Sequence, residues 1–148
     1  MSESPSYPIH ELRTRRRIEF ADTDMGGIVH FSRFFVFMET AEHEFLRALG
    51  AEVHMDLDDM HIGWPRVEAS CQYLSPAHLG DELEIHVRVA RKGGKSMTYA
   101  FTFSCGENII ARGRMSSVCC QMNASDGLKA IPIPAAIADR IGEPPRLA

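Results

Sequence analysis

The chain has 148 residues, which is the length of one ordinary domain. Hydrophobic residues make up 45% and charged residues 24%, a balance typical of a soluble globular protein. Sixteen basic against twenty acidic side chains give a net charge of −4, which argues against a general nucleic-acid-binding protein. The sequence shows neither a secretory signal nor a long apolar run, so we expect a cytoplasmic protein that does not cross a membrane.

The first half of the chain predicts a strand, a loop and one long helix. Residues 12–20 end in the alternating pattern of a strand, and a polar, glycine-containing loop follows over 21–31. Within 33–49 the apolar residues recur at offsets of three and four, which indicates an amphipathic helix. Ser32 is placed to cap the start of this helix, and Gly50 is a natural stop just beyond its end.

The second half changes to the period of two that is typical of strands. After an irregular stretch over 51–63, Gly and Pro turns separate four alternating runs, which cover 67–73, 83–89, 97–103 and 108–122. Because only one side of each run is apolar, antiparallel pairing is favoured. The sequence therefore predicts an α+β fold in which a curled antiparallel sheet wraps around one long central helix. A short terminal helix is expected over 133–141, with one domain over 12–142 and tails over 1–11 and 143–148.

The loop before the long helix carries the residues best suited to chemistry. Asp22, Asp24, Gly26 and Gly27 lead directly into the helix start. Glycines let backbone amides approach a ligand closely, and a helix start presents unpaired N–H groups with partial positive charge. Such a site can stabilise an oxyanion while a carboxylate acts as a base or a nucleophile. The spacing partly imitates a calcium loop, but Arg33 stands where that loop needs a glutamate, which argues against calcium.

The segment Arg17–His30, together with the helix after it, resembles the 4-hydroxybenzoyl-CoA thioesterase family of hot-dog-fold proteins. The resemblance rests on the pattern D-x-D-x-x-G followed by two hydrophobic residues, and it continues through 73–76, 80–83 and 94–96 to 128–134. It implies a single hot-dog domain that hydrolyses an acyl-CoA thioester with a small or aromatic acyl group and uses no cofactor. It also implies a homodimer or homotetramer whose active sites form at the dimer interface.

The resemblance assigns roles to two residues of the loop. The catalytic carboxylate falls on Asp24, and the oxyanion donor is a main-chain N–H near Phe31. Asp24 can attack the thioester carbonyl to give a mixed anhydride that water opens, or it can act as general base on the attacking water. The sequence leaves both routes open. It also leaves open that Asp24 only satisfies loop amides, and it favours a structural role for Asp22.

Further residues are expected around the substrate. Gly27, His30, Arg33 and Trp64 are the candidate substrate-binding residues. Arg33 replaces an Asn that many members of the resembled family carry, and His30 and Trp64 fit packing roles equally well. Coenzyme A requires cations for its phosphates. The residues that the resemblance and the Gly-Gly turn offer for this purpose are Arg91, Lys95, Ser96 and Lys129.

Two other functions remain open at this point. A hot-dog dehydratase or hydratase would use His30 with Glu39, which otherwise is a solvated or interface carboxylate. A non-catalytic acyl-CoA-binding protein would hold the same ligand without turnover. No metal site is expected, since His43-Glu44 has Arg47 where a zinc protease needs its second histidine and the other histidines match no ligand spacing.

Overall fold

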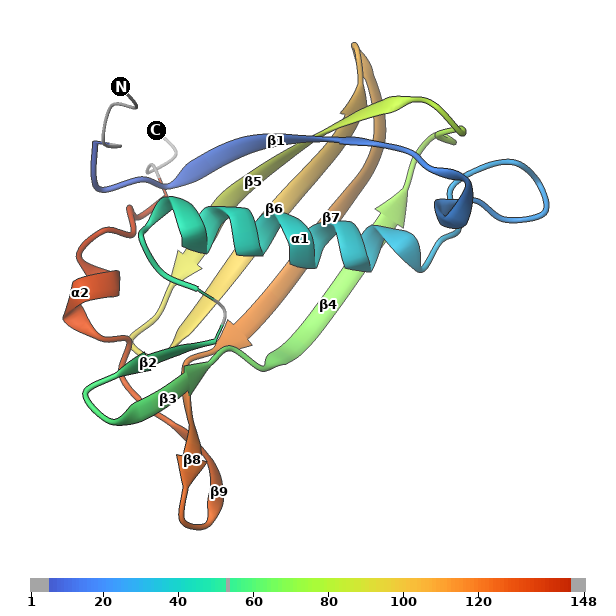
Figure 1. Cartoon of the computed structure of the whole chain (residues 1–148). Helices are drawn as coiled ribbons and strands as arrows, with labels where there is room; N and C mark the ends of the chain where they lie inside the picture. Colours follow the sequence, from blue (N-terminus) through green and yellow to red (C-terminus); the bar gives the residue numbers. More distant parts are fainter. Residues whose placement is uncertain (1–5, 53, 145–148) are drawn as a thin grey trace.

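One long helix lies across the concave side of a curved antiparallel sheet (Figure 1). The computed structural model describes residues 6–52 and 54–144. The main sheet has five strands in the order β1-β5-β6-β7-β4. The long helix is α1 (Arg33–Ala48), and the strands of the main sheet are β1 (Glu11–Arg17), β4 (Arg66–Tyr73), β5 (Glu82–Lys92), β6 (Ser96–Cys105) and β7 (Asn108–Val118). The predicted combination of an antiparallel sheet with one long helix is confirmed.

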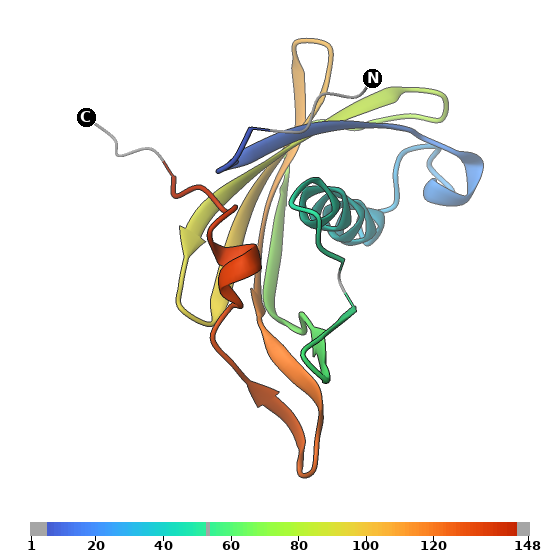
Figure 2. The ribbon, with the colours of Figure 1, turned by 60° about the vertical axis from the view of Figure 1, so that its left-hand side comes forward.

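The core fills the space between α1 and the sheet, which curves around the helix (Figure 2). Alternate residues of β5 and β6 are buried, and so is one stripe of α1. Phe37 and Phe45 of the helix are fully buried, and the ring centroid of Phe45 lies 5.6 Å from that of Tyr99. Burying each such ring contributes about 2–3 kcal/mol. This packing fixes the helix on the sheet and therefore positions the loop that leads into the helix.

β4 forms one edge of the main sheet and is unusually exposed along its length. Its only strand partner in the described chain is β7, so the other side of its backbone has no ladder. Val67 is 65% exposed and Tyr73 is 47% exposed. An edge strand with free backbone groups and apolar side chains is a template for pairing with another chain.

A second, four-stranded sheet in the order β2-β3-β8-β9 lies at one end of the molecule. Its strands are β2 (Met55–Leu57), β3 (Met60–Gly63), β8 (Cys120–Ala124) and β9 (Gly127–Ala130). The stretch over 51–63, which was expected to be irregular, therefore contains a hairpin that turns at Asp58 and Asp59, both with positive φ. The run over 108–122, which was expected to be one strand, forms two strands instead. They are separated at Cys119, whose N–H donates to the Lys95 carbonyl and whose carbonyl accepts the Ile131 N–H.

Both predicted helices form, with differences at their ends. α1 ends at Ala48, and Gly50 follows with a φ of 76°, as expected for a stop. The predicted side-chain cap is wrong, because the Ser32 hydroxyl bonds to the His30 ring instead of a helix amide. The C-terminal helix is reduced to α2 (Ala135–Ala138), with Pro134 just before it. Within the described residues, no helix is long and apolar enough to cross a membrane.

Residues close to the N-terminus take part in the fold. Ile9 pairs with Ile141 and donates its N–H to the carbonyl of Arg140 at 3.0 Å. β1 then begins at Glu11. Residues 9–11, which the sequence assigns to a tail, thus belong with the domain. The outer parts of both expected tails, 1–5 and 145–148, lie outside the described residues.

Candidate active site

The loop between β1 and α1 folds back on itself and extends beyond the N-terminal end of the helix (Figure 1). Thr23 pairs with Val29, and the Asp24 N–H donates to the Ile28 carbonyl at 2.8 Å. Gly27 closes the turn by donating to the Asp24 carbonyl at 3.0 Å, with a φ of 77°. Because that left-handed conformation favours glycine, the position explains its residue type. Gly27 therefore shapes the loop that carries Asp24.

The Asp24 side chain is exposed and oriented by one backbone bond. Its Oδ1 accepts the Gly26 N–H at 2.8 Å, whereas Oδ2 accepts no hydrogen bond from any described residue. Asp24 borders two adjacent hollows of about 820 and 450 Å³. One carboxylate oxygen is thus held in place while the other is available to a ligand.

The backbone N–H of Phe31 is the second available group beside these hollows. Around it, Val29 donates to Ala77, His30 donates to the Asp22 carbonyl, and Arg33 donates to the His30 carbonyl. Ser32 donates to Nδ1 of His30 at 3.2 Å. The Phe31 N–H has no acceptor among residues 6–52 and 54–144. Phe31 thus offers a free N–H near a helix start and borders the same hollows as the Asp24 carboxylate, which is the combination that an oxyanion-stabilising site requires.

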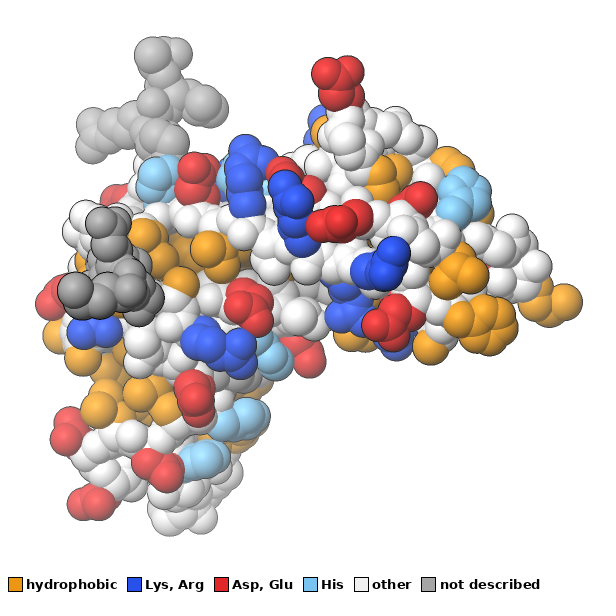
Figure 3. All heavy atoms as spheres, turned by 45° about the horizontal axis from the view of Figure 1, so that its top comes forward, with side chains coloured by type: hydrophobic (Ala, Val, Ile, Leu, Met, Phe, Trp, Pro, Cys, Tyr) orange, Lys and Arg blue, Asp and Glu red, His pale blue; other side chains and the backbone are white. Residues whose placement is uncertain are grey.

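Apolar side chains surround this polar pair. Both hollows are bordered by Asp24, Ile28 and Phe31, and the smaller one also by Phe34 and Tyr73. Phe31 is 63% exposed, and Phe20 and Met25 of the same loop are more exposed still. Figure 3 shows hydrophobic side chains gathered on the loop end of the molecule. The hollows can therefore receive an apolar group next to the Asp24 carboxylate.

Asp22 has a structural role, as expected, and it is the ion-pair partner of Arg33. Asp22 is buried, and its carboxylate accepts the Glu19 N–H at 2.9 Å and two bonds from Arg33 at 2.7 and 3.0 Å. Arg16 lies 3.5 Å away. Burial raises the pKa of Asp22, but the Glu19 N–H and the two guanidiniums outweigh it and hold that pKa below its usual value. Arg33, a candidate substrate-binding residue, instead clamps the loop onto the helix and borders neither hollow.

His30 borders the larger hollow with its ring stacked against Phe31, the two centroids being 4.5 Å apart. Its Nδ1 lies 2.7 Å from the Ser32 hydroxyl and accepts the Ser32 N–H. Because Nδ1 accepts, the neutral ring carries its proton on Nε2. The structure thus brings three expected residues, His30, Phe31 and Asp24, to one hollow.

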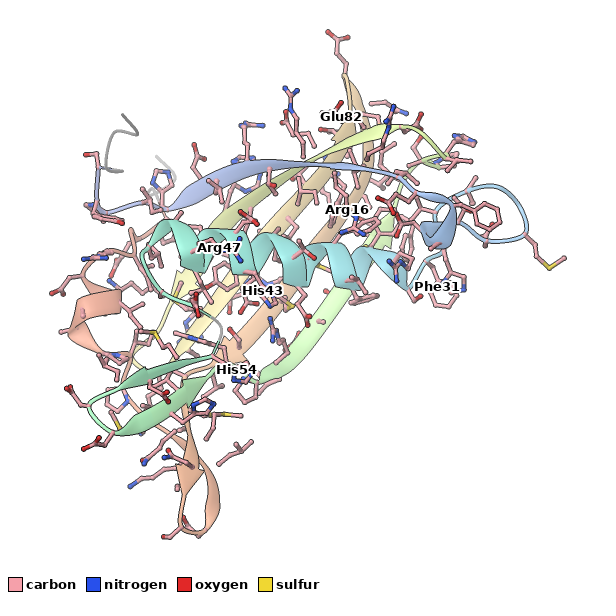
Figure 4. The ribbon with its side chains drawn as sticks, in the orientation of Figure 1. Arg16, Phe31, His43, Arg47, His54 and Glu82 are labelled. Carbon is pink, nitrogen blue, oxygen red and sulfur yellow. The ribbon has the colours of Figure 1, made fainter. Side chains whose placement is uncertain are left out.

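The remaining candidates lie elsewhere in the single chain. Trp64 is buried just before the Arg66 end of β4, whereas the opposite end of that strand, Tyr73, borders the smaller hollow. Figure 4 shows the same separation along α1, with Phe31 at its N-terminal end and His43 on its C-terminal half. One chain alone therefore does not place Trp64 beside Asp24.

The expected CoA-binding residues lie at the same distant end. Arg91, Lys95 and Ser96 surround the turn between β5 and β6, and Lys129 is on β9. The other end of β5 follows His78, which pairs with Ile28 of the loop. Since β5 has 11 residues, its two ends are about 33 Å apart. The structure thus separates these four residues from Asp24 within one chain.

Two features escaped the sequence interpretation. Tyr73 donates its hydroxyl to the Phe31 carbonyl at 2.8 Å, which the alternation of β4 does not reveal. Glu42 is fully buried on α1, with Oε2 at 3.3 Å from Nη2 of Arg66. Burial raises the pKa of Glu42 to about 7, although Arg66 opposes the shift. Glu39, the alternative dehydratase residue, is half exposed at 3.9 Å from Arg66 and does not border the hollows.

The side chains near the loop do not form a metal site. Within the described part of the chain, no three His, Cys, Asp or Glu side chains form a group that could hold a metal ion. The available chemistry beside the loop consists of a carboxylate, a backbone N–H and an imidazole.

Comparison with known proteins assigns the chain to a protein superfamily. Residues 18–141 match the Thioesterase-like superfamily. The chain belongs to this superfamily. The match includes the loop, α1 and all strands after it, and it confirms the resemblance on which Asp24 and Phe31 were assigned.

Individual relatives of this chain are named as an esterase, an acyl-CoA hydrolase and an acyl-CoA thioesterase. A putative esterase of Aquifex aeolicus is 36% identical over 90 residues, covering 61% of this chain and 66% of that protein. A 1,4-dihydroxy-2-naphthoyl-CoA hydrolase of Prochlorococcus marinus is 30% identical over 111 residues, covering 70% of this chain and 74% of that protein. A solved gentisyl-coenzyme A thioesterase is 29% identical with a TM-score of 0.77, covering 88% of this chain and 100% of that one.

Proposed function

We propose that the protein hydrolyses an acyl-CoA thioester with a small or aromatic acyl group to the free acid and coenzyme A. The observation that carries the proposal is that Phe31, whose N–H has no acceptor among the described residues, and Asp24, with its unpaired carboxylate oxygen, border the same two hollows. The apolar surroundings suit an aromatic acyl group. The named activities of the relatives, on naphthoyl and gentisyl thioesters, support the same substrate class.

The reaction follows from the two available groups. The thioester oxygen accepts the Phe31 N–H, which stabilises the negative charge that develops as the carbonyl carbon is attacked. In one route the free oxygen of Asp24 attacks, the carbon–sulfur bond breaks, CoA leaves as the thiolate, and water opens the mixed anhydride. In the other route Asp24 takes a proton from water as that water attacks the carbonyl carbon. The carbon–sulfur bond then breaks, and Asp24 returns the proton to the departing CoA thiolate. Both routes need the Phe31 N–H on the carbonyl oxygen, but they place Asp24 differently. Its oxygen must contact the carbonyl carbon in order to attack, whereas one water must lie between the two in order for Asp24 to act as a base.

The proposal includes a homodimer in which the exposed edges of two β4 strands pair. A twofold axis makes that pairing antiparallel, so the Tyr73 end of one strand meets the Arg66 end of the other. The Arg66 end pairs with Ser117, which in turn pairs with Met97 next to Lys95 and Ser96. The distant cations of the partner subunit would then lie near the loop, which reconciles their separation from Asp24 within one chain.

The test measures thiol release from acyl-CoAs ranging from acetyl to palmitoyl, with benzoyl, hydroxybenzoyl and phenylacetyl esters included. Asp24→Asn keeps an oxygen to accept the Gly26 N–H but removes the charge, so we expect kcat to fall roughly a hundredfold or more. Asp56→Asn is the matched control, because that carboxylate is exposed on β2 far along the chain from the loop, and it should retain parental turnover.

Each contrary outcome has a definite meaning. Parental turnover in Asp24→Asn removes that residue from the reaction. Binding of acyl-CoAs without turnover by the parent replaces the enzyme with an acyl-CoA-binding protein. Hydration of an enoyl thioester in place of hydrolysis identifies a hot-dog hydratase.

A further inference from the structure

Tyr73 connects the edge strand of the sheet to the loop end of the helix. Its hydroxyl donates to the Phe31 carbonyl at 2.8 Å across 42 residues of sequence. Its ring packs edge-on against Phe34, with the centroids 5.5 Å apart at 66°. The hydroxyl is thereby directed to the backbone of the residue that offers the free N–H.

The Phe31 backbone depends on this contact because little else restrains it. The peptide before Phe31 is held by the Arg33 N–H on the His30 carbonyl at 2.9 Å. In the peptide after Phe31, the Ser32 N–H donates to the His30 ring. The Phe31 carbonyl of that peptide accepts a hydrogen bond from Tyr73 and from no other described residue. The Phe31 side chain is mostly exposed, so packing adds little restraint. Removing the tyrosine hydroxyl therefore leaves the peptide after Phe31 held only by the longer Ser32 N–H bond.

We propose that Tyr73 is a positioning residue for the reaction: its hydroxyl holds the Phe31 backbone so that the neighbouring N–H points at the thioester oxygen. The inference rests on the proposed function. Its hydroxyl acts on the reaction through Phe31, because the hydroxyl proton is already donated to the Phe31 carbonyl. Burial, followed by the nearby Cys71 thiol, raises the pKa of Tyr73, so the hydroxyl remains a donor across the neutral range.

A matched pair of substitutions tests this role. Tyr73→Phe removes the hydroxyl but keeps the ring against Phe34. Tyr7→Phe is the control, because the Tyr7 hydroxyl makes the same kind of bond, to the Ala48 carbonyl at 3.0 Å, at the other end of α1. Misdirecting an oxyanion donor costs transition-state stabilisation more than substrate binding. We therefore expect Tyr73→Phe to lower kcat roughly tenfold with KM within about twofold, and Tyr7→Phe to leave both constants near the parental values.

Two kinetic results would overturn the proposal. One is a kcat for Tyr73→Phe no lower than that of Tyr7→Phe, which would make the bond purely structural. The other is a raised KM with an unchanged kcat, which would make Tyr73 a substrate-binding residue.

A measurement without substrate separates this proposal from the proposed function. Loss of the hydroxyl should shift the carbonyl ¹³C resonance of Phe31 in Tyr73→Phe, with no shift in Tyr7→Phe. An unchanged Phe31 resonance rejects the positioning role whatever the kinetics show. If that resonance shifts but the parent hydrolyses no thioester, the hydroxyl does restrain the loop and the proposed function is what fails.

Discussion

Asp22 and Glu42 are two buried carboxyl groups whose surroundings shift their pKa values in opposite directions. Asp22 receives a backbone N–H and two bonds from Arg33, and these hold its pKa below the usual value despite burial. Glu42 faces Arg66 at 3.3 Å, yet neither of its oxygens has a hydrogen bond within the described chain. Burial therefore dominates and raises the pKa of Glu42 to about 7. A carboxylate without hydrogen bonds is costly in the interior.

This difference predicts how stability depends on pH. The pKa of Glu42 is about 7 in the folded protein against a reference value of 4.5, so the folded state binds the extra proton between these values. Its contribution to the free energy of unfolding is therefore fully present below pH 4.5 and is lost as pH rises from there through about 7. Glu42→Gln removes the charge, and we expect its free energy of unfolding to exceed that of the parent by up to about 3 kcal/mol at pH 8.5 while matching it near pH 4.

Urea unfolding at both pH values measures the effect. Glu44→Gln is the control, because Glu44 lies on the same helix but is partly exposed and pairs with Arg47 at 3.0 Å, so it should show no such gap. A constant difference between Glu42→Gln and the parent across this pH range contradicts the assigned pKa shift.

At the scale of elements, the loop between β1 and α1 holds its carboxylate through tight backbone turns. A Cβ added at Gly26 would lie 3.2 Å from Oδ1 of Asp24, which is closer than ordinary van der Waals contact. We therefore expect Gly26→Ala to displace the carboxylate and lower kcat several-fold, with a loss of stability of about 1 kcal/mol or less. The expectation is checked by steady-state kinetics together with thermal unfolding.

Gly106→Ala provides the control for this loop. Gly106 lies in the turn between β6 and β7 with no atom within 4 Å of an added Cβ, but its φ of 59° makes alanine strained there. We therefore expect a similar loss of stability with a parental kcat. Equal kcat values for Gly26→Ala and Gly106→Ala would show that the Asp24 carboxylate tolerates the displacement.

Sequence could identify the parts of the site that are contiguous in the chain. The loop pattern predicted a carboxylate next to the free N–H groups of a helix start, and the family resemblance placed these on Asp24 and Phe31. The structure brings both residues to the same hollows. The ion pair between Arg33 and Asp22 could not be predicted, because the two residues meet only when the loop folds back. The break between β7 and β8 was equally hidden, since alternation continues through Cys119 while the strand changes sheets. Tyr73 was missed because its partner lies 42 residues away.

At the scale of the whole molecule, the edge strand β4 links the candidate active site to the proposed homodimer. Its Tyr73 end contacts the loop, and its Arg66 end leads to Trp64, with the β5–β6 turn beyond the neighbouring strands. A single chain exposes this edge with Val67 and Tyr73 on it. Antiparallel pairing of two such edges covers the strand and brings together the two halves of the proposed site.

The shared site predicts that two inactive variants restore activity when their subunits are mixed. Asp24→Asn lacks the carboxylate, whereas the double variant Lys95→Ala, Lys129→Ala keeps Asp24 but lacks the proposed CoA-binding cations. A mixed dimer contains one site with the carboxylate of one subunit and both cations of the other, and that site is intact. Random exchange of equal amounts makes half of the dimers mixed, each with one intact site of two, so we expect about a quarter of the parental activity.

The measurement is turnover at a substrate concentration well below the KM of the double variant, after unfolding and refolding the two proteins together. The same proteins refolded separately and then combined on ice are the control, because their subunits have not exchanged. If each subunit instead carried a complete site of its own, every mixture would show only the sum of the two variants. Activity above that sum therefore requires that the carboxylate and the cations come from different subunits.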